Sequence, residues 1–156
     1  MDRSGRKWGI NMLMGEYHHN IDDKGRLIIP SKFRNEIGGE CIITRGLDKC
    51  LFIYSKSEWE KMTQKLKTLP FTKKDARDFS RFLLGGATVC EFDHSGRINI
   101  TSPLVHYANL TKNCVLIGVN ERIEILDEEE YNTFINSNID NFSDIAENLL
   151  DGGYDA

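Results

Sequence analysis

Short apolar runs alternate along this chain with amphipathic stretches, a pattern that predicts a mixture of strands and helices. Runs rich in β-branched residues predict strands at residues 40–45, 50–54, 113–119 and 122–126. Apolar residues at helical spacing predict helices at residues 57–69, 72–84, 127–136 and 143–150. Such a set of elements is typical of an α+β protein.

The segment that begins at Ile21 recurs 71 positions later. The letters IDDKGRLIIPS at residues 21–31 become FDHSGRINITS at residues 92–102, and the Asp, Gly, Arg and Ser positions are identical. Later features return in the same order, such as Cys41 with Cys114. A shared order over roughly 40 residues indicates an internal duplication.

Each copy contains the motif D-x-x-G-R, which predicts a tight turn. Asp22 and Asp93 can accept hydrogen bonds from backbone N–H groups two residues later, and Gly25 and Gly96 can adopt a positive φ at low steric cost. We expect a type I turn with a glycine bulge, which returns Arg26 to the ladder at the base of a tight hairpin.

A short helix is expected after each turn and its following strand. Gly38 is expected to end the first of these helices, and Asn109 is expected to end the second in the left-handed conformation. Pro103 fits the first helical position of the second one, where its missing N–H costs nothing. Across both copies and the helices between them, the expected N-caps are Ser31, Ser57, Thr72 and Ser102.

Each copy alone is too small to bury both faces of its sheet, so the two copies are expected to share one pseudo-twofold core. The expected first and second modules are residues 14–58 and 87–131, with connecting helices at 59–86 and an acidic helical tail at 132–156. Residues 1–13 have no periodicity and no counterpart in the other copy, so we expect a disordered leader.

Charge is segregated along the chain. The net charge is −4, but residues 1–120 contain 19 Lys/Arg and 13 Asp/Glu, a net +6, whereas residues 121–156 contain 1 and 11, a net −10. A mildly basic body is compatible with binding to a polyanion. A solvated acidic tail without any bearing on binding is equally compatible with these numbers.

Other classes of protein find little support. The four cysteines form no C-x-x-C pair, and Cys41, Cys90 and Cys114 lie in or beside strands, so buried reduced thiols are expected. The four histidines show no metal-ligand spacing, and we expect no metal and no cofactor. The duplicated Asp/Arg pair lacks a shared histidine, since His94 is present in the second copy only. We therefore expect no catalytic residues and no enzyme.

No apolar run approaches the roughly 20 residues that a membrane span requires. The N-terminus also lacks the pattern of a secretion signal. A cytoplasmic protein without a membrane partner is expected.

Taken together, these motifs resemble the MraZ family over about residues 14–150. The resemblance rests on GEY at 15–17, DDKGRLIIP at 22–30, TRGLDKCL at 44–51, LPFTKKDAR at 69–77 and FDHSGRI at 92–98. It implies two tandem modules similar to the AbrB/SpoVT swapped-hairpin fold, so that one chain imitates a dimer of single-module relatives. It also implies a nucleoid-associated regulator, mainly a repressor, which forms a ring-shaped homo-oligomer. Such a ring binds double-stranded DNA at direct repeats in the promoter of the division and cell-wall gene cluster.

In that family the D-x-x-x-R motif of each module is associated with DNA contact, which carries over to Arg26 and Arg97. A guanidinium group is always charged and binds phosphate or a guanine edge in bidentate fashion. Lys24 is expected to contact phosphate, and Lys32 and Arg34 add positive charge in the first copy alone. The residues expected to cap the turns and orient the arginines are Asp22, Gly25, Asp93 and Gly96.

Three alternatives remain open at this point. Each arginine can instead form a surface ion pair with the nearby Asp that stabilises the turn and nothing more. The turns can bind another protein, in which case the ring is a scaffold. An antitoxin-type operator binder shares the fold, but its trailing segment would be a disordered tail, whereas residues 127–150 are expected to be helical.

Overall fold

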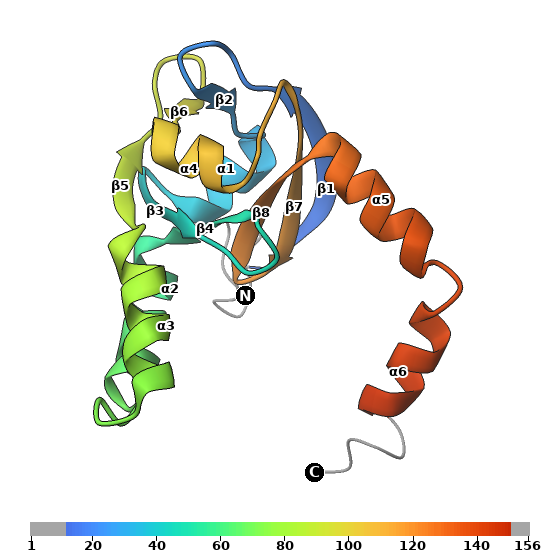
Figure 1. The fold of residues 1–156 in the computed structure, drawn as a ribbon. Coiled ribbons are helices and arrows are strands. Elements are labelled where there is room, and N and C mark those ends of the chain that lie inside the picture. The colour runs from blue at the N-terminus through green and yellow to red at the C-terminus, as the bar shows by residue number, and fades with distance from the viewer. Residues whose placement is uncertain (1–11, 151–156) are drawn as a thin grey trace, which may run out of the picture.

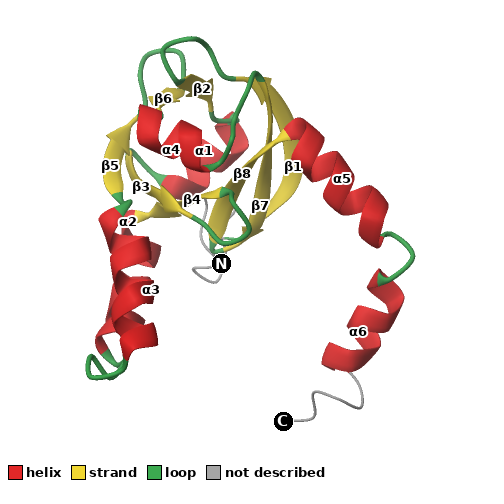
Figure 2. Cartoon of the chain, viewed as in Figure 1, coloured by secondary structure: helices red, strands yellow, loops and turns green. Residues whose placement is uncertain are grey.

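The α+β class is confirmed by the computed structural model, which describes residues 12–150 (Figures 1 and 2). Its strands are β1 (Leu13–Asn20), β2 (Arg26–Ile28), β3 (Glu40–Arg45), β4 (Leu51–Ser55), β5 (Thr88–Glu91), β6 (Arg97–Asn99), β7 (Asn113–Asn120) and β8 (Arg122–Asp127). Its helices are α1 (Ser31–Ile37), α2 (Lys56–Lys67), α3 (Lys74–Gly85), α4 (Ser102–Tyr107), α5 (Glu128–Asn138) and α6 (Phe142–Leu150).

The two repeats exchange strands throughout. The larger sheet has the order β1-β7-β8-β4-β3-β5, and all of its neighbouring strands are antiparallel. Strands β1, β3 and β4 belong to the first repeat, and β5, β7 and β8 belong to the second. The order therefore reads the same from either end once the repeats are interchanged, as the expected pseudo-twofold arrangement requires.

The expected tight hairpin is wrong in its pairing, although the turn itself is present. Gly25 has a φ of 81° and donates its N–H to the carbonyl oxygen of Asp22 at 3.0 Å. However, β1 pairs with β7, and β2 pairs with β6 of the other repeat, where Leu27 lies opposite Ile98. A three-residue strand cannot bury its own apolar residue, and this exchange buries both Leu27 and Ile98.

One apolar core is shared by both repeats. Leu27 and Ile98 lie on the inner side of the small β2–β6 ribbon, and Phe33 of α1 and Leu104 of α4 join them in the same cluster. The remaining partners come from the large sheet, including β4 and β8, which meet at its centre. Each repeat thus completes the core of the other.

The expected helix starts are wrong by one or two residues. In α2 the cap is Ser55, whose hydroxyl accepts a hydrogen bond from the Glu58 N–H at 3.2 Å. The N-terminal flanking residues of α1, α3 and α4 make no side-chain capping bond. Little chain separates α1, α2 and α4 from the strands before them. Each of these helices therefore begins earlier than its expected cap, Ser31, Ser57 or Ser102, predicts. The expected caps that the structure does not support are Ser31, Ser57, Thr72 and Ser102.

The expected helix ends agree better with the structure. Gly38 and Asn109 adopt φ values of 95° and 53° after α1 and α4. Pro103, however, is the second residue of α4 rather than the first. Most of the expected leader, residues 1–11, lies outside the described residues, and Leu13 begins β1 and is buried.

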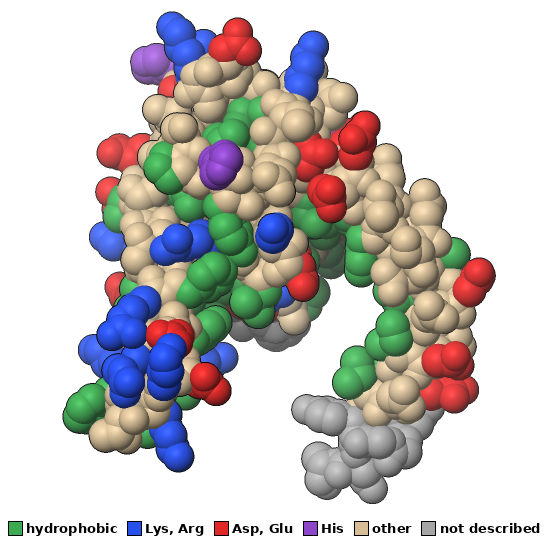
Figure 3. All heavy atoms as spheres, in the orientation of Figure 1, with side chains coloured by type: hydrophobic (Ala, Val, Ile, Leu, Met, Phe, Trp, Pro, Cys, Tyr) green, Lys and Arg blue, Asp and Glu red, His purple; other side chains and the backbone are tan. Residues whose placement is uncertain are grey.

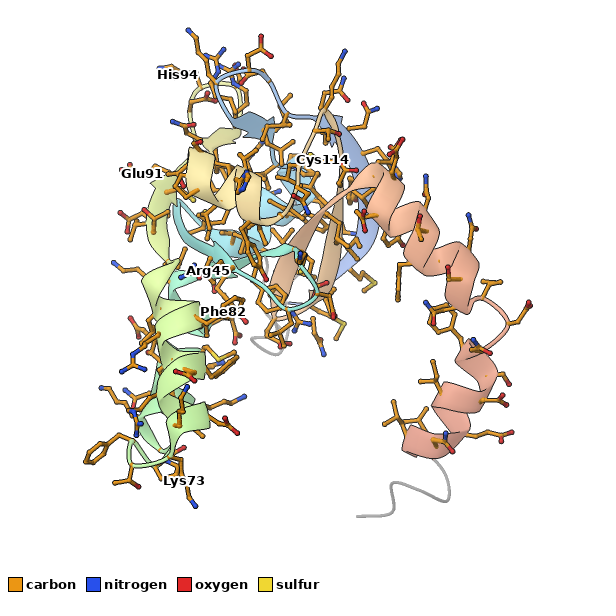
Figure 4. The ribbon with its side chains drawn as sticks, viewed as in Figure 1. Arg45, Lys73, Phe82, Glu91, His94 and Cys114 are labelled. Atoms are coloured by element: carbon orange, nitrogen blue, oxygen red, sulfur yellow. The ribbon has the colours of Figure 1, made fainter. Side chains whose placement is uncertain are left out.

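Two helical arms project from opposite sides of the body (Figure 1). The basic arm, residues 56–85, contains α2 and α3. It is attached where Arg45 stacks on Phe82 at 5.3 Å and donates from Nε to the Phe82 carbonyl oxygen at 2.9 Å (Figure 4). The acidic arm, residues 128–150, contains α5 and α6. Neither arm, nor any other helix between residues 12 and 150, is long and apolar enough to cross a membrane.

Candidate nucleic-acid interface

The two D-x-x-G-R turns flank the β2–β6 ribbon at one end of the molecule (Figure 1). Each turn is hydrogen-bonded to the strand of the other repeat. Ile29 donates its N–H to the Gly96 carbonyl oxygen at 3.0 Å, and Ile100 donates to the Gly25 carbonyl oxygen at 2.7 Å. The exchange of strands therefore brings together two turns that are 71 residues apart in sequence.

The register of the ribbon places both arginines on its outer face. Arg26 lies opposite Asn99, and Arg97 lies opposite Ile28. Because side chains alternate along a strand, all four residues share one face, while Leu27 and Ile98 point into the core. Arg26 and Arg97 are diagonal neighbours, a relation that separates Cα atoms by about 7–8 Å. We call this outer surface the arginine face.

Each arginine is held by the aspartate of its own turn with nearly the same geometry. Asp22 accepts the backbone N–H groups of Lys24 and Arg26 on Oδ1, both at 2.9 Å, and the Arg26 Nε on Oδ2 at 2.7 Å. Asp93 accepts the Arg97 backbone N–H on Oδ1 and the Arg97 Nε on Oδ2, each at 2.9 Å. One carboxylate thus fixes both the turn and the guanidinium.

Hydrogen bonds set the charge state of the two aspartates. The backbone N–H of Arg26 is the main cause that lowers the pKa of Asp22, and that of Arg97 does the same to the pKa of Asp93. Both carboxylates therefore remain ionised and keep accepting at neutral pH. In each turn a negative charge lies directly beside the arginine, so the net field outside the turn is weaker than that of a free arginine.

The guanidinium ends stay accessible despite these ion pairs. The side chain of Arg26 is 38% exposed and that of Arg97 is 30% exposed. Among the side-chain nitrogens of each arginine, only Nε donates a hydrogen bond to an acceptor within residues 12–150. The Nη1 and Nη2 atoms therefore have donors left for an external acceptor such as a phosphate oxygen.

The other residues expected to bind DNA differ in their surroundings. Lys24 and Lys32 are exposed. Arg34 is half-buried, and its Nη1 donates to the carbonyl oxygen of Ile29 at 2.8 Å. The same guanidinium covers Gly96 so closely that a Cβ at that glycine would collide with it. Arg34 thus supports the turn of the second repeat.

The first turn faces a hollow, whereas the Arg34 guanidinium lies against Gly96 of the second turn. The hollow has a volume of about 660 Å³ and is lined by Lys24, Ser102, Val105, Lys112 and their neighbours. Val105 occupies the position in α4 that Arg34 occupies in α1, and its shorter side chain leaves the space open. The duplicated turns are therefore equivalent in backbone but different in their surroundings.

Sequence reasoning missed Lys112 as a member of this surface. It is exposed beside the first turn, where its carbonyl oxygen accepts the Ile21 N–H at 2.8 Å. No local pattern links residue 112 to residue 24, because only the exchange of strands brings them together. In the space-filling view the end of the molecule that bears the turns shows Lys and Arg side chains mixed with a few carboxylates (Figure 3). His94 of the second turn lies there too (Figure 4).

Metal chemistry finds no support in the part of the chain that the structure describes. No group of three or more His, Cys, Asp or Glu side chains in this part is arranged to hold a metal ion.

Comparison with known families agrees with the duplication. The family model described as "MraZ protein, putative antitoxin-like" matches the chain twice, at residues 12–82 and 83–152. The two matched segments adjoin within α3 and cover nearly the whole chain. Each segment contains one D-x-x-G-R turn and its aspartate–arginine pair.

Proposed function

The chain belongs to the MraZ family, and on that premise we propose that it is a transcriptional regulator that binds specific DNA sequences. The family is a regulatory, non-enzymatic one. The proposed target is double-stranded DNA with short direct repeats, in the promoter of the division and cell-wall gene cluster. There the protein acts mainly as a repressor, in the cytoplasm at the nucleoid.

The arginine face is the single observation that carries this proposal. Arg26 and Arg97 lie on the outer face of one ribbon, each with its Nε bound by a carboxylate and its side chain partly exposed. A guanidinium that is already oriented loses little side-chain entropy on binding. The neighbouring lysines, Lys24 and Lys112, supply charge for the phosphate backbone, to which most protein–DNA hydrogen bonds go.

The observed ion pairs are also what the purely structural alternative expects. A surface ion pair contributes at most about 1 kcal/mol to stability. That role requires only one guanidinium nitrogen and leaves the Nη donors of both arginines without an acceptor among residues 12–150. Their shared direction favours an external ligand.

The two arms support assembly into a homo-oligomer, which we propose is a ring. The basic arm contains eight Lys/Arg and four Asp/Glu, whereas the acidic arm contains six Asp/Glu and no Lys/Arg. A groove in the basic arm has apolar walls that include Leu66, Leu69 and Phe71 and basic residues at its rim. In the acidic arm, Ile145 and Leu149 of α6 are 42% and 54% exposed.

A second copy is the occupant that fits this groove. Its α6 offers apolar side chains for the walls and negative charge for the rim. The arms project from opposite sides of the body (Figures 1 and 3), so such contacts join copies head to tail. Head-to-tail contacts close into a ring when the rotation allows it. A ring presents several arginine faces to repeated DNA sites and gains avidity, which compensates for the modest charge of each face.

An electrophoretic mobility shift assay on the DNA upstream of the protein's own gene tests the proposal. The wild type is expected to bind repeat-containing DNA with an affinity that falls as salt rises. Arg26→Ala should weaken binding without changing the oligomer size measured by sedimentation. Lys61→Ala is the matched control, since Lys61 is an exposed cation on the basic arm, far from the arginine face.

A scaffold ring without specific DNA binding is the second candidate. The exposed apolar side chains of both arms favour it, because assembly alone would explain them. Oligomers that bind random and repeat-containing DNA equally weakly, and do so independently of Arg26, would support the scaffold and exclude the regulator.

A further inference from the structure

Two cysteines that are far apart in sequence face each other across the edge of the large sheet. Cys41 of β3 lies directly opposite Cys90 of β5, and their Sγ atoms are 3.0 Å apart. One belongs to the first repeat and the other to the second. Directly opposite residues in an antiparallel pair have Cα atoms about 4.5–5.5 Å apart. That range lies within the Cα separations that a disulfide spans.

We propose that Cys41 and Cys90 form a site of reversible oxidation, at which a hydroperoxide converts the two thiols into a disulfide that links the repeats. The proposal is independent of DNA binding. It rests on the facing thiols, on the edge position of β5, and on the contrast with the other two cysteines.

Cys90 is the thiol that a small oxidant reaches first. Its residue is partly exposed on β5, an edge strand that within residues 12–150 pairs with β3 alone, whereas Cys41 is fully buried. The hydrogen bond from Cys41 lowers the pKa of Cys90, while the same contact, followed by burial, raises the pKa of Cys41. Cys90 is therefore the more acidic thiol of the pair, and Cys41 is the partner that keeps its proton.

The reaction balances with hydrogen peroxide as the oxidant. The Cys90 thiolate attacks one peroxide oxygen, the O–O bond breaks, and the departing hydroxide takes up a proton from solvent to become water. The Sγ of Cys41 then attacks the Cys90 sulfenic acid. The S–O bond breaks, the S–S bond forms, and the leaving hydroxide accepts the Cys41 proton. In total, two thiols are oxidised and one peroxide is reduced to two waters.

The other two cysteines serve as internal controls. Cys50 and Cys114 are buried, and burial raises the pKa of each thiol to about 12. The Cys50 thiol donates to the Leu47 carbonyl oxygen at 2.9 Å, and within residues 12–150 neither cysteine has another thiol as a hydrogen-bond partner. Both are expected to stay reduced under oxidation that links Cys41 to Cys90.

The disulfide would secure the least supported strand of the sheet. Strand β5 has four residues, and its next pair, Glu40 opposite Glu91, places like charges across the ladder. Glu91 marks this outer edge in Figure 4. The chain continues from β5 directly into the turn that bears Arg97. A covalent link at Cys90 therefore holds the second turn as well as the strand.

The test is to treat the purified full chain with a small molar excess of hydrogen peroxide and then to analyse it by mass spectrometry after alkylation in denaturant. We expect an intramolecular Cys41–Cys90 cross-link, the loss of two hydrogen atoms, and two thiols that remain free for alkylation. The thermal midpoint should rise by about 10 °C, since a loop of this length gives a strongly stabilising link. Dithiothreitol should reverse both changes.

Variants separate the pair from general oxidation. Cys90→Ser and Cys41→Ala should each abolish the cross-link and the rise in thermal midpoint, whereas Cys114→Ala should keep both. If the substitution at Cys41 in the core prevents folding, Cys90→Ser on the edge strand is sufficient to test the cross-link. The proposal is overturned by a Cys90 sulfinic acid without any cross-link, by a disulfide between protomers, or by a cross-link that leaves the thermal midpoint unchanged.

Discussion

The two turn glycines are equivalent in sequence but face different neighbours, so replacing each by alanine tests how the turns are packed. Gly25 and Gly96 have φ values of 81° and 77°. An L residue in this region costs about 1–2 kcal/mol at either position. A Cβ at Gly25 would collide with the backbone carbonyl of Ile100, whereas a Cβ at Gly96 would collide with the Arg34 guanidinium.

The collision of the new Cβ makes a second contribution to the loss of stability, and this contribution differs between Gly25 and Gly96. Ile100 cannot move without disturbing the 2.7 Å bond from its N–H to the Gly25 carbonyl oxygen, and overpacking of this kind costs about 1–3 kcal/mol. Gly25→Ala should therefore lower the free energy of unfolding by about 2–5 kcal/mol. Arg34 can swing into solvent, which costs only its hydrogen bond to Ile29, about 1 kcal/mol. Gly96→Ala should thus cost about 2–3 kcal/mol.

A double-mutant cycle isolates this difference. In an Arg34→Ala background, Gly96→Ala should cost about 1 kcal/mol less than in the wild type, whereas the cost of Gly25→Ala should not change. Urea unfolding followed by circular dichroism, at one fixed protein concentration, measures all six proteins. Equal costs for the two glycines in both backgrounds would refute the packing described for Ile100 and Arg34.

Three further predictions concern the arms and the first turn. His18 donates to Glu128 of α5 at 2.8 Å and to Glu16 at 2.9 Å, contacts that raise its pKa. The stabilisation of α5 by these His18 contacts is therefore fully present below about pH 6.5. It is lost as the pH rises through the raised pKa of His18. The protection factors of amides in α5, which compare exchange with the base-catalysed intrinsic rate at each pH, should fall at high pH, and less so in His18→Gln. Lys24→Ala should weaken DNA binding several-fold at every sequence tested and lower the salt dependence by about one ion. Leu149→Asp should reduce the oligomer size measured by sedimentation, because it puts a charge on the apolar face of α6.

Each of these three predictions has an outcome that would contradict it. Protection factors in α5 that do not change with pH would show that His18 does not hold the arm, although Tyr131 also donates to Glu16 at 2.6 Å. A sequence-dependent loss in Lys24→Ala would assign that lysine to base contact instead. Unchanged sedimentation of Leu149→Asp, with Ser143→Asp as the matched control, would place the subunit contact elsewhere.

Local features were predictable because single residues determine them. The D-x-x-G-R letters predict the turns, and Gly25 and Gly96 have the positive φ that such turns require. The bounds of β3 agree with the prediction, because its β-branched residues Ile42, Ile43 and Thr44 favour a strand and Gly46 follows its last residue. Helix starts were less predictable. A serine at the end of a strand, as at Ser55, can cap a helix as well as the next serine along the chain.

The pairing of strands was not predictable from the residues alone. Leu27 needs a partner across the ribbon, but nothing in its neighbourhood says that the partner is Ile98 rather than a residue of β1. For the same reason, the contact between Cys41 and Cys90 and the place of Lys112 beside the first turn could not be predicted. Only the resemblance to a swapped-hairpin family pointed to an exchange, because long-range partners depend on the whole set of apolar faces.

The central claim is that Arg26 and Arg97 present their free guanidinium nitrogens to a DNA backbone from one outer face. Fluorescence anisotropy of a labelled repeat-containing duplex, titrated at several salt concentrations, tests this most directly. The double variant Arg26→Ala/Arg97→Ala should bind with a salt dependence lower by about two ions than that of the wild type, at an unchanged oligomer size. A double variant that binds with the affinity and the salt dependence of the wild type would contradict the claim.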